Sequence, residues 1–425
     1  MRVLLDNVAF RRLFLGRLLA NAGDSLYYVA AMWLVYELGG SAFYTGLAGF
    51  LARFPLTLQF LVGPLVDRSP LKRPLVASPL AQALLLLSVP LAAVTGVLNV
   101  WVVLAVMPLV AAAAQFAPPA QHATMPRIVE KEDLVEANSA FSFAYQGTDL
   151  VFIALGGVLV GLVGAVTMFV VDSIALAIAA GLFALVAIPD ARNAERSGSD
   201  EPILGTYLAE LRAGLSYVRG SVLMAMLVGT MVLNFVTGAT MAVLPAFAAR
   251  HGGPETYGLL LAAILGGVLV GALSTSLFEH FRLGPAVSAG FALSGVAWLC
   301  ALVVPGLAAT AALFGLTWIA GGAYNVLSTS LKQTYVPEEL LGRVSSVSVS
   351  LSVAALPIGS LLGGIAGEHV GVVAVMAATG VGLLFVAGYW LAHPALRGMP
   401  AVGSIEPERY GLTEPDVWSA TDRSG

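Results

Sequence analysis

The chain contains many uninterrupted apolar runs of about 20 residues, and this feature restricts its fold more than any other. An α-helix needs about 20 such residues to cross the hydrocarbon part of a membrane. Charged residues make up only 11% of the 425 residues and hydrophobic residues 58%, whereas soluble domains carry about 25% charged residues. Because the runs are continuous rather than alternating, a β-barrel is excluded. The sequence predicts an all-α polytopic membrane protein.

Twelve membrane-spanning helices can be placed in two groups of six. The predicted spans are 12–37, 44–66, 73–95, 98–118, 138–163, 166–189, 221–248, 255–279, 284–304, 307–330, 344–367 and 370–392, with a long polar break at 119–137. The predicted domains are an N-terminal six-helix bundle at 1–189, a cytoplasmic linker with an amphipathic helix at 190–220, a C-terminal six-helix bundle at 221–393 and a cytoplasmic polar tail at 394–425.

The basic residues orient this layout. When the loops alternate across the membrane, the Arg and Lys residues outside the spans fall on one side, and only Arg250 falls on the other. Cytoplasmic loops carry an excess of Arg and Lys, so we expect a cell-membrane protein with both termini in the cytoplasm. The amphipathic part of the linker can lie on the lipid surface, or it can be a plain linker helix.

A short polar loop between the second and third predicted spans carries a motif. Gly63, Asp67, Arg68, Lys72 and Arg73 are its members. The motif resembles the loop between helices 2 and 3 of the major facilitator superfamily, with a proline in place of the second glycine of the family pattern. The resemblance implies two pseudo-repeated six-helix bundles, transport by alternating access, and a role for these five residues in a cytoplasmic gate.

Further segments place the chain closer to one branch of that superfamily. They are Asn21–Asp24 in the first span, Met125–Val129 after the fourth and Gly342–Ser346 before the eleventh. They resemble proteins of the enterobactin-exporter and macrolide-efflux type. The arginine in helix 4 and the Gly-Pro pair in helix 5 that drug antiporters of the superfamily often carry are missing here, so these motifs do not imply proton coupling.

Three charged residues fall deep inside predicted spans: Asp24, Arg53 and Asp149. A charge near the bilayer centre costs roughly 2.5–3.5 kcal/mol on insertion scales. At about 1.5 Å of rise per residue, all three lie at a similar depth. They are candidates for a buried cluster that binds protons, and the alternative is a static salt bridge that holds the N-terminal bundle together.

The resemblance implies a substrate cavity between helices 1, 4, 7 and 10. Polar residues of the corresponding spans are the candidates to line it: Asn21, Tyr28, Gln115, Asn234, Thr237, Tyr324 and Asn325. Amides and phenols in an apolar wall suit an amphipathic or hydrophobic substrate better than a sugar or a phosphate. Each of these residues can equally form a hydrogen bond between two helices.

The sequence thus predicts a secondary transporter that exports small amphipathic or hydrophobic molecules, such as drugs or siderophore-like compounds, by proton antiport. Alternatives on the same fold are an importer, a uniporter or a lipid translocator, and one from another class is a non-transporting membrane sensor or scaffold. We expect a monomer that contacts small molecules, protons and lipid. We expect no enzymatic activity, no cofactor, no metal and no nucleic-acid partner, and the chain has no phosphate-binding loop for ATP.

Overall fold

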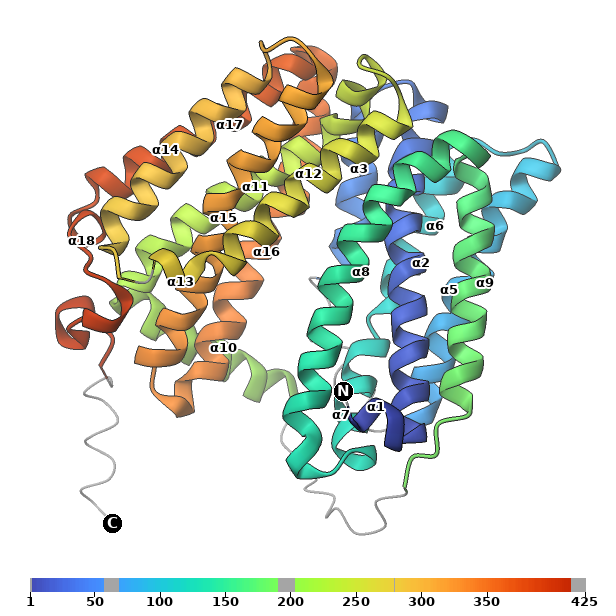
Figure 1. Ribbon diagram of the computed structural model, residues 1–425, viewed down its shortest axis with the longest axis horizontal. Coiled ribbons are helices and arrows are strands. Elements are labelled where there is room, and N and C mark those ends of the chain that lie inside the picture. Colours follow the sequence, from blue (N-terminus) through green and yellow to red (C-terminus); the bar gives the residue numbers. More distant parts are fainter. Residues whose placement is uncertain (1, 57–68, 190–202, 279, 414–425) are drawn as a thin grey trace. The chain divides into compact units, whose positions relative to one another are not determined.

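The computed structural model describes residues 2–56, 69–189, 203–278 and 280–413. Helices dominate these residues, which contain no strand, and this confirms the all-α prediction. Ten helical segments of the described chain are long and apolar enough to cross a membrane. The described chain divides into two compact units, shown with the labelled helices in Figure 1. Unit 1 comprises 1–198 with 241–262, and unit 2 comprises 199–240 with 263–425.

Unit 1 is arranged around α2, a long helix that packs against α8 and α9. Its helices are α1 (Arg2–Asp6), α2 (Val8–Gly39), α3 (Ala42–Arg53), α5 (Lys72–Val94), α6 (Val100–Ala114), α7 (Ala117–Ile128), α8 (Leu134–Val163) and α9 (Ala165–Ala184). Asn7 begins α2 by accepting a hydrogen bond of 2.9 Å from the backbone N–H of Phe10. Gly40 ends it with φ at 68°, where a glycine is favoured. Local capping therefore fixes both ends of the central helix.

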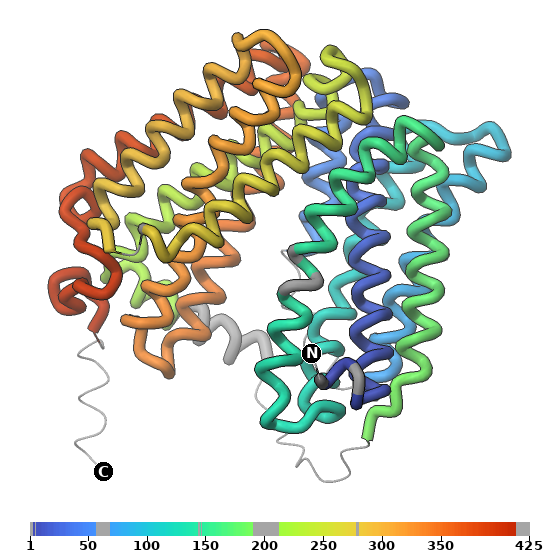
Figure 2. The backbone as a smooth tube through the Cα atoms, viewed as in Figure 1, coloured from blue at the N-terminus to red at the C-terminus, as the bar shows by residue number. Residues whose placement is uncertain are grey.

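Unit 2 contains the remaining helices, whose paths can be followed in Figure 2. They are α10 (Ile203–Gly220), α11 (Val222–Ala249), α12 (Pro254–Leu273), α13 (Thr275–Phe278), α14 (Leu283–Ala301), α15 (Leu307–Tyr335), α16 (Glu338–His369), α17 (Val372–Ala392) and α18 (Pro394–Arg397), with the end of α11 and the start of α12 counted in unit 1. Trp298 anchors its core. The indole is fully buried, stacks on Phe314 at 4.1 Å and donates a hydrogen bond to the Met376 carbonyl.

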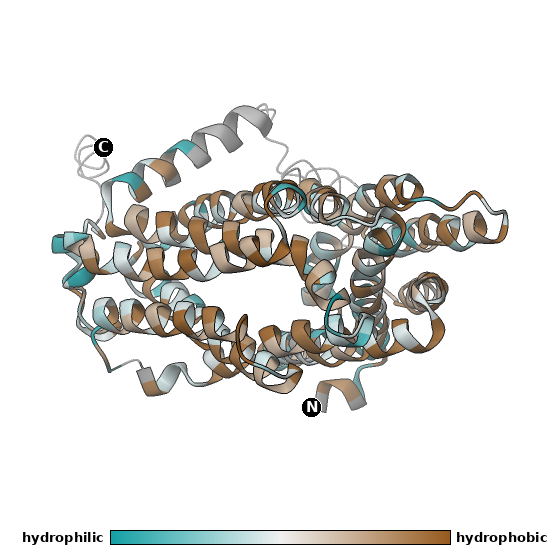
Figure 3. Cartoon of the chain, turned by 90° about the horizontal axis from the view of Figure 1, so that it is seen from above, coloured by the Kyte–Doolittle hydropathy of each residue, from teal (hydrophilic) through white to brown (hydrophobic). Residues whose placement is uncertain are grey.

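Glycines bring the helices of unit 2 into backbone contact. A Cβ added to Gly267 of α12 would lie 2.0 Å from the carbonyl oxygen of Gly315 in α15, and one on Gly271 would lie 2.0 Å from that of Ile319. A Cβ on Gly359 of α16 would lie 2.0 Å from the carbonyl oxygen of Phe235 in α11. Small residues at such spacing let helices pack closely where lipid supplies no hydrophobic drive. Many large apolar side chains of the described helices are exposed, and apolar residues predominate along the helices (Figure 3).

Several helices extend beyond the apolar runs that predict them. The polar break expected at 119–137 is mostly helical, because α7 continues to Ile128 and α8 begins at Leu134. Likewise α15 continues to Tyr335, five residues beyond the predicted end at 330. Hydropathy marks the part of a helix that meets hydrocarbon, whereas backbone hydrogen bonds carry the helix on into the polar region. The predicted boundaries are therefore too short at these ends.

The described part of the linker is a helix that packs on its own unit. α10 lies against α16. A Cβ on Gly214 would lie 2.7 Å from the carbonyl oxygen of Arg343, and Tyr217 is almost fully buried. Burial raises the pKa of the Tyr217 phenol to about 12, so this phenol stays neutral. The described buried side chains of α10 therefore pack against other helices of unit 2.

Candidate functional site

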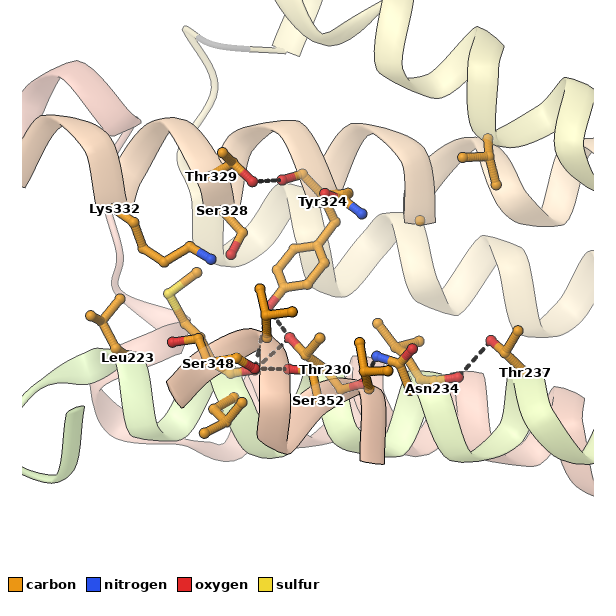
Figure 4. Close-up of a pocket in the computed structure, with 18 of the residues that line it drawn as sticks. Leu223, Thr230, Asn234, Thr237, Tyr324, Ser328, Thr329, Lys332, Ser348 and Ser352 are labelled. Carbon is orange, nitrogen blue, oxygen red and sulfur yellow. Dashed lines mark hydrogen bonds between the residues drawn. The ribbon is translucent and has the colours of Figure 1, made fainter. Parts of the chain in front are cut away.

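Unit 2 contains a cavity of about 400 Å³ between α11, α15 and α16, with Val268 of α12 at its edge. We call it the unit-2 cavity; Figure 4 shows the polar side chains that project into it. Four predicted substrate-site residues line it together: Asn234, Thr237, Tyr324 and Asn325. Its apolar wall includes Leu223, Met226, Leu227 and Trp318.

Hydrogen bonds, some within one helix and some between two helices, hold several of these polar side chains in place. The Tyr324 hydroxyl lies 3.1 Å from the Thr230 hydroxyl and 3.3 Å from the Met226 carbonyl oxygen, which ties α15 to α11. The Asn234 amide donates to the Thr230 carbonyl at 3.0 Å, and the Thr237 hydroxyl donates to that of Leu233 at 2.7 Å. The cavity wall thus presents hydroxyl and amide groups, held by hydrogen bonds, beside apolar side chains.

Lys332 supplies the one charge among the described lining residues of this cavity. Its half-buried side chain extends from the last turn of α15 toward Ser348 and Ser328 (Figure 4). Among the described residues, no acidic side chain lines the cavity and no carboxylate pairs with the ammonium group. The negative end of the α15 dipole favours a cation at this place. The sequence pattern missed this residue because the predicted span ends at 330, although Ser328 and Lys332 are four residues apart and so share a helix face.

A second polar cluster lies in unit 1 around Asp149 of α8. Its Oδ1 accepts hydrogen bonds from the Asn21 amide at 2.9 Å and from the Ser25 hydroxyl at 2.8 Å, both on α2. Asn21 and Ser25 are buried. The Ser25 hydroxyl also has the Asn21 carbonyl oxygen within 2.8 Å. Asp149 is therefore a hydrogen-bonded contact between α2 and α8.

The other two charges predicted for this cluster have different neighbours. The Arg53 guanidinium lies over the ring of Tyr28, 5.8 Å from its centroid, and within the described residues Arg53 forms no ion pair with Asp24 or Asp149. Arg17, Asp149 and Asp172 are ionisable groups close enough to Asp24 to interact with it. Arg17, which the sequence pattern did not single out, stacks on Tyr145 at 5.0 Å and donates a hydrogen bond to its hydroxyl.

Asp172 of α9 is a further acidic residue in the interior of unit 1. Its side chain is fully buried, and neither carboxyl oxygen has a hydrogen-bond partner among the described residues. A Cβ on Gly23 of α2 would lie 2.0 Å from its Oδ1, so the carboxyl group lies directly against the α2 backbone. A single Asp in an apolar run can be recognised in the sequence as a buried charge. The sequence does not show which helix its carboxyl group faces.

The remaining predicted site residues are placed as follows. Asn21 and Tyr28 belong to the unit 1 clusters described above, and the Gln115 amide is buried and donates to the Ala111 carbonyl at 3.1 Å. Of the gate motif, Gly63, Asp67 and Arg68 lie outside the described residues, whereas Lys72 and Arg73 open α5 with exposed side chains. No group of three or more His, Cys, Asp or Glu side chains in the described part of the chain could hold a metal ion.

Known proteins resemble the chain over almost its whole length. A "Transmembrane secretion effector" family model matches residues 4–422. The multidrug efflux pump Tap of Mycolicibacterium fortuitum is 26% identical over 89% of this chain and 94% of its own. Macrolide efflux protein A of Streptococcus pyogenes is 24% identical over 85% of this chain and 90% of its own.

Solved structures resemble the fold. An inward-facing, unoccupied bacterial homologue of the human lysosomal transporter Spinster matches with a TM-score of 0.69 and 15% identity, over 90% of this chain and 95% of that one. This agreement confirms the twelve-helix fold predicted above. The helices, the cavity among them and the family match over residues 4–422 show that the chain belongs to the transmembrane secretion effector family of the major facilitator superfamily.

Proposed function

We propose that this protein exports small amphipathic molecules from the cytoplasm. The observation that carries the proposal is the unit-2 cavity, about 400 Å³ in volume and lined by membrane helices. Cavities that bind small molecules combine an apolar wall with polar groups that fix the orientation of the ligand. In this cavity polar side chains are as numerous as apolar ones, which suits a molecule with both a polar and an apolar part. The relatives that are named efflux proteins support the direction of transport. The activity is transport without covalent change of the substrate.

The charge of the cavity favours neutral or anionic substrates over cationic ones. Lys332 contributes a positive charge, and no acidic side chain among the described lining residues offsets it. A sulfonate or carboxylate on an amphipathic molecule can accept hydrogen bonds from the ammonium group and from Ser328 or Ser348, while its apolar part lies against Trp318 and Leu227. Hydrogen bonds to a charged group contribute about 1.5–3 kcal/mol.

Binding of three probes with one skeleton tests this assignment. Phenylbutyl sulfonate, phenylbutanol and phenylbutyl trimethylammonium share the phenylbutyl chain and carry an anionic, a neutral and a cationic head group. Calorimetric titration of the purified protein is expected to rank the sulfonate first and the ammonium last. Lys332→Gln is expected to weaken sulfonate binding roughly tenfold or more, whereas binding of phenylbutanol changes little.

Lys131→Gln is the matched control, because it removes the same charge from an exposed position in unit 1. It is expected to leave all three affinities unchanged. Equal affinities for the three probes in the wild-type protein would refute the charge preference. If none of them binds or is transported, the export proposal itself fails.

We also propose that proton exchange drives export, with Asp24 and Asp149 as the candidate proton carriers in unit 1. The two carboxyl groups interact electrostatically inside a membrane bundle, where an ionisable side chain is costly and is usually functional. Counterflow of phenylbutyl sulfonate in proteoliposomes, with and without a pH gradient, distinguishes an antiporter from a uniporter or an importer. Transport that does not respond to the gradient would exclude proton coupling.

The orientation proposed here places both termini on the cytoplasmic side of the cell membrane, with the protein acting as a monomer. Thr95 and Ser404 are exposed at ends of unit 1 and unit 2 that the predicted topology assigns to opposite sides. In a Cys300→Ala background, Thr95→Cys is expected to react with an impermeant maleimide added outside intact cells, and Ser404→Cys only after permeabilisation. Labelling of both from outside would exclude this topology.

A further inference from the structure

Asp172 stands out because burial and the lack of partners coincide in the middle of a membrane helix. From Asp172 to the two ends of α9 (Ala165–Ala184) the distances along the axis are about 10 Å and about 18 Å. Its side chain is fully buried, and both carboxyl oxygens are without a hydrogen-bond partner within the described residues. Native proteins almost always satisfy buried polar groups, so such a group calls for a specific explanation.

The ionised form of this carboxyl group is strongly disfavoured. An isolated carboxylate in apolar surroundings loses its hydration and gains nothing in return, so such a group takes up a proton instead. Asp149 has donors from Asn21 and Ser25 on its Oδ1, whereas Asp172 has none among the described residues. The two carboxyl groups therefore differ in their surroundings, and among the described residues only that of Asp172 has no donor to stabilise its ionised form.

The helices packed against α9 determine which groups can exchange a proton with Asp172. α2 contributes Asp24 and Tyr27, both close enough to interact electrostatically with it, and Gly23 lets the carboxyl group touch the helix backbone. The titratable residues of α5 are Lys72 and Arg73 in its first turn. Those of α8 are Glu136, Tyr145 and Asp149, which are not among the groups acting on Asp172. Asp24 is thus the neighbouring acid.

We propose that Asp172 is a proton-binding site, held as the neutral carboxylic acid and exchanging its proton through Asp24. In the exchange the O–H bond of Asp172 breaks and an O–H bond forms on the Asp24 carboxylate, and no other reactant takes part. Asp24 is mostly buried but keeps some accessible surface, and we take this surface as the exit of the proton from the bundle. The part that this exchange plays in transport rests on the export function proposed above; the protonation of Asp172 does not.

Infrared spectroscopy of the purified full-length protein at neutral pH tests the proposal directly. A protonated carboxyl group gives a C=O stretch above the amide I band that shifts in D₂O. This band is expected in the wild-type protein and lost in Asp172→Asn, which keeps the size and shape of the side chain. Asp149→Asn, a matched change in the same bundle, is expected to retain it. Asp24→Asn is expected to retain the band but to slow its shift after transfer to D₂O.

The outcomes separate this proposal from the export function. A band that persists in Asp172→Asn, or that disappears only in Asp149→Asn, would overturn the proton site whether or not the protein transports anything. If the band is lost in Asp172→Asn, the same variant in proteoliposomes is expected to bind phenylbutyl sulfonate like the wild type and to lose acceleration by a pH gradient. Loss of the band with unchanged acceleration would show that the proton is structural and would overturn its exchange in the cycle.

Discussion

Replacement of Gly267 by leucine is expected to prevent unit 2 from folding. A Cβ at this position would already lie 2.0 Å from the carbonyl oxygen of Gly315 and 3.1 Å from its Cα. The obstacle is backbone on the facing helix, so no side-chain rotation relieves the clash. Overpacking a core costs about 1–3 kcal/mol for small insertions, and folded proteins are stable by only about 5–15 kcal/mol. The expected result is loss of the monodisperse peak in size-exclusion chromatography after detergent extraction.

The neighbouring residue of α12 provides the control. No atom lies within 4 Å of a Cβ added to Gly266. Gly266→Ala is therefore expected to raise the free energy of unfolding by about 0.5–1 kcal/mol, because alanine is the better helix former. Gly267→Ala is expected to lower it by about 1–3 kcal/mol. Changes of the same sign at both positions, measured by thermal unfolding in detergent, would contradict this account of the α12–α15 contact.

These glycines show how far a sequence determines this fold. The four-residue spacing of Gly267 and Gly271 predicts that α12 meets another helix closely, because small residues at that spacing make a smooth face. The partner cannot be read from the sequence. Several helices of unit 2 carry glycines, and only the structure pairs Gly267 with Gly315 and Gly359 with Phe235. The positions of the membrane helices, in contrast, follow from the length of the apolar runs in the sequence.

Lys332 shows why part of the candidate site could not be predicted. Hydropathy ends the tenth predicted span at 330 and assigns Lys332 to a cytoplasmic loop, yet α15 continues to Tyr335 and the side chain reaches the unit-2 cavity. The long stem of a lysine can lie along an apolar wall while its head reaches polar surroundings. The predicted end of the helix lies a few residues too early, and for this reason Lys332 is assigned to a loop although it belongs to the candidate site. The spacing from Tyr324 to Ser328 to Lys332 is the signal that could have identified it.

The buried charges of unit 1 show a different limit. Depth along each helix follows from counting residues, and Asp24 and Asp149, which have a similar predicted depth, interact electrostatically in the structure. The rotation of each helix about its axis does not follow from counting. Arg53 consequently faces Tyr28, and the neighbour of Gly23 is Asp172 rather than any residue selected by depth. Pairing of buried groups needs the packed structure.

The hydrogen bonds at Asp149 lead to the last prediction. Asp149→Leu is expected to lower the free energy of unfolding by about 1–3 kcal/mol, the cost of one unsatisfied buried donor. That donor is one N–H of the Asn21 amide, which is 8% exposed and loses its 2.9 Å acceptor, while the Tyr145 carbonyl oxygen at 3.4 Å can still accept from the other N–H. The Ser25 hydroxyl adds little to the loss, because the Asn21 carbonyl oxygen still accepts from it at 2.8 Å. Asp149→Asn keeps an acceptor oxygen and is expected to cost less.

A double-mutant cycle measured by thermal unfolding in detergent isolates this bond. Asn21→Leu combined with Asp149→Leu removes donor and acceptor together, so no buried polar group is left without a partner. The double variant is expected to be more stable than Asp149→Leu alone, since apolar pairs can replace buried polar pairs at little cost. A double variant destabilised by the full sum of the two single losses would mean that the residues act independently. The hydrogen bond between Asn21 and Asp149 would then add nothing to the stability of the contact between α2 and α8.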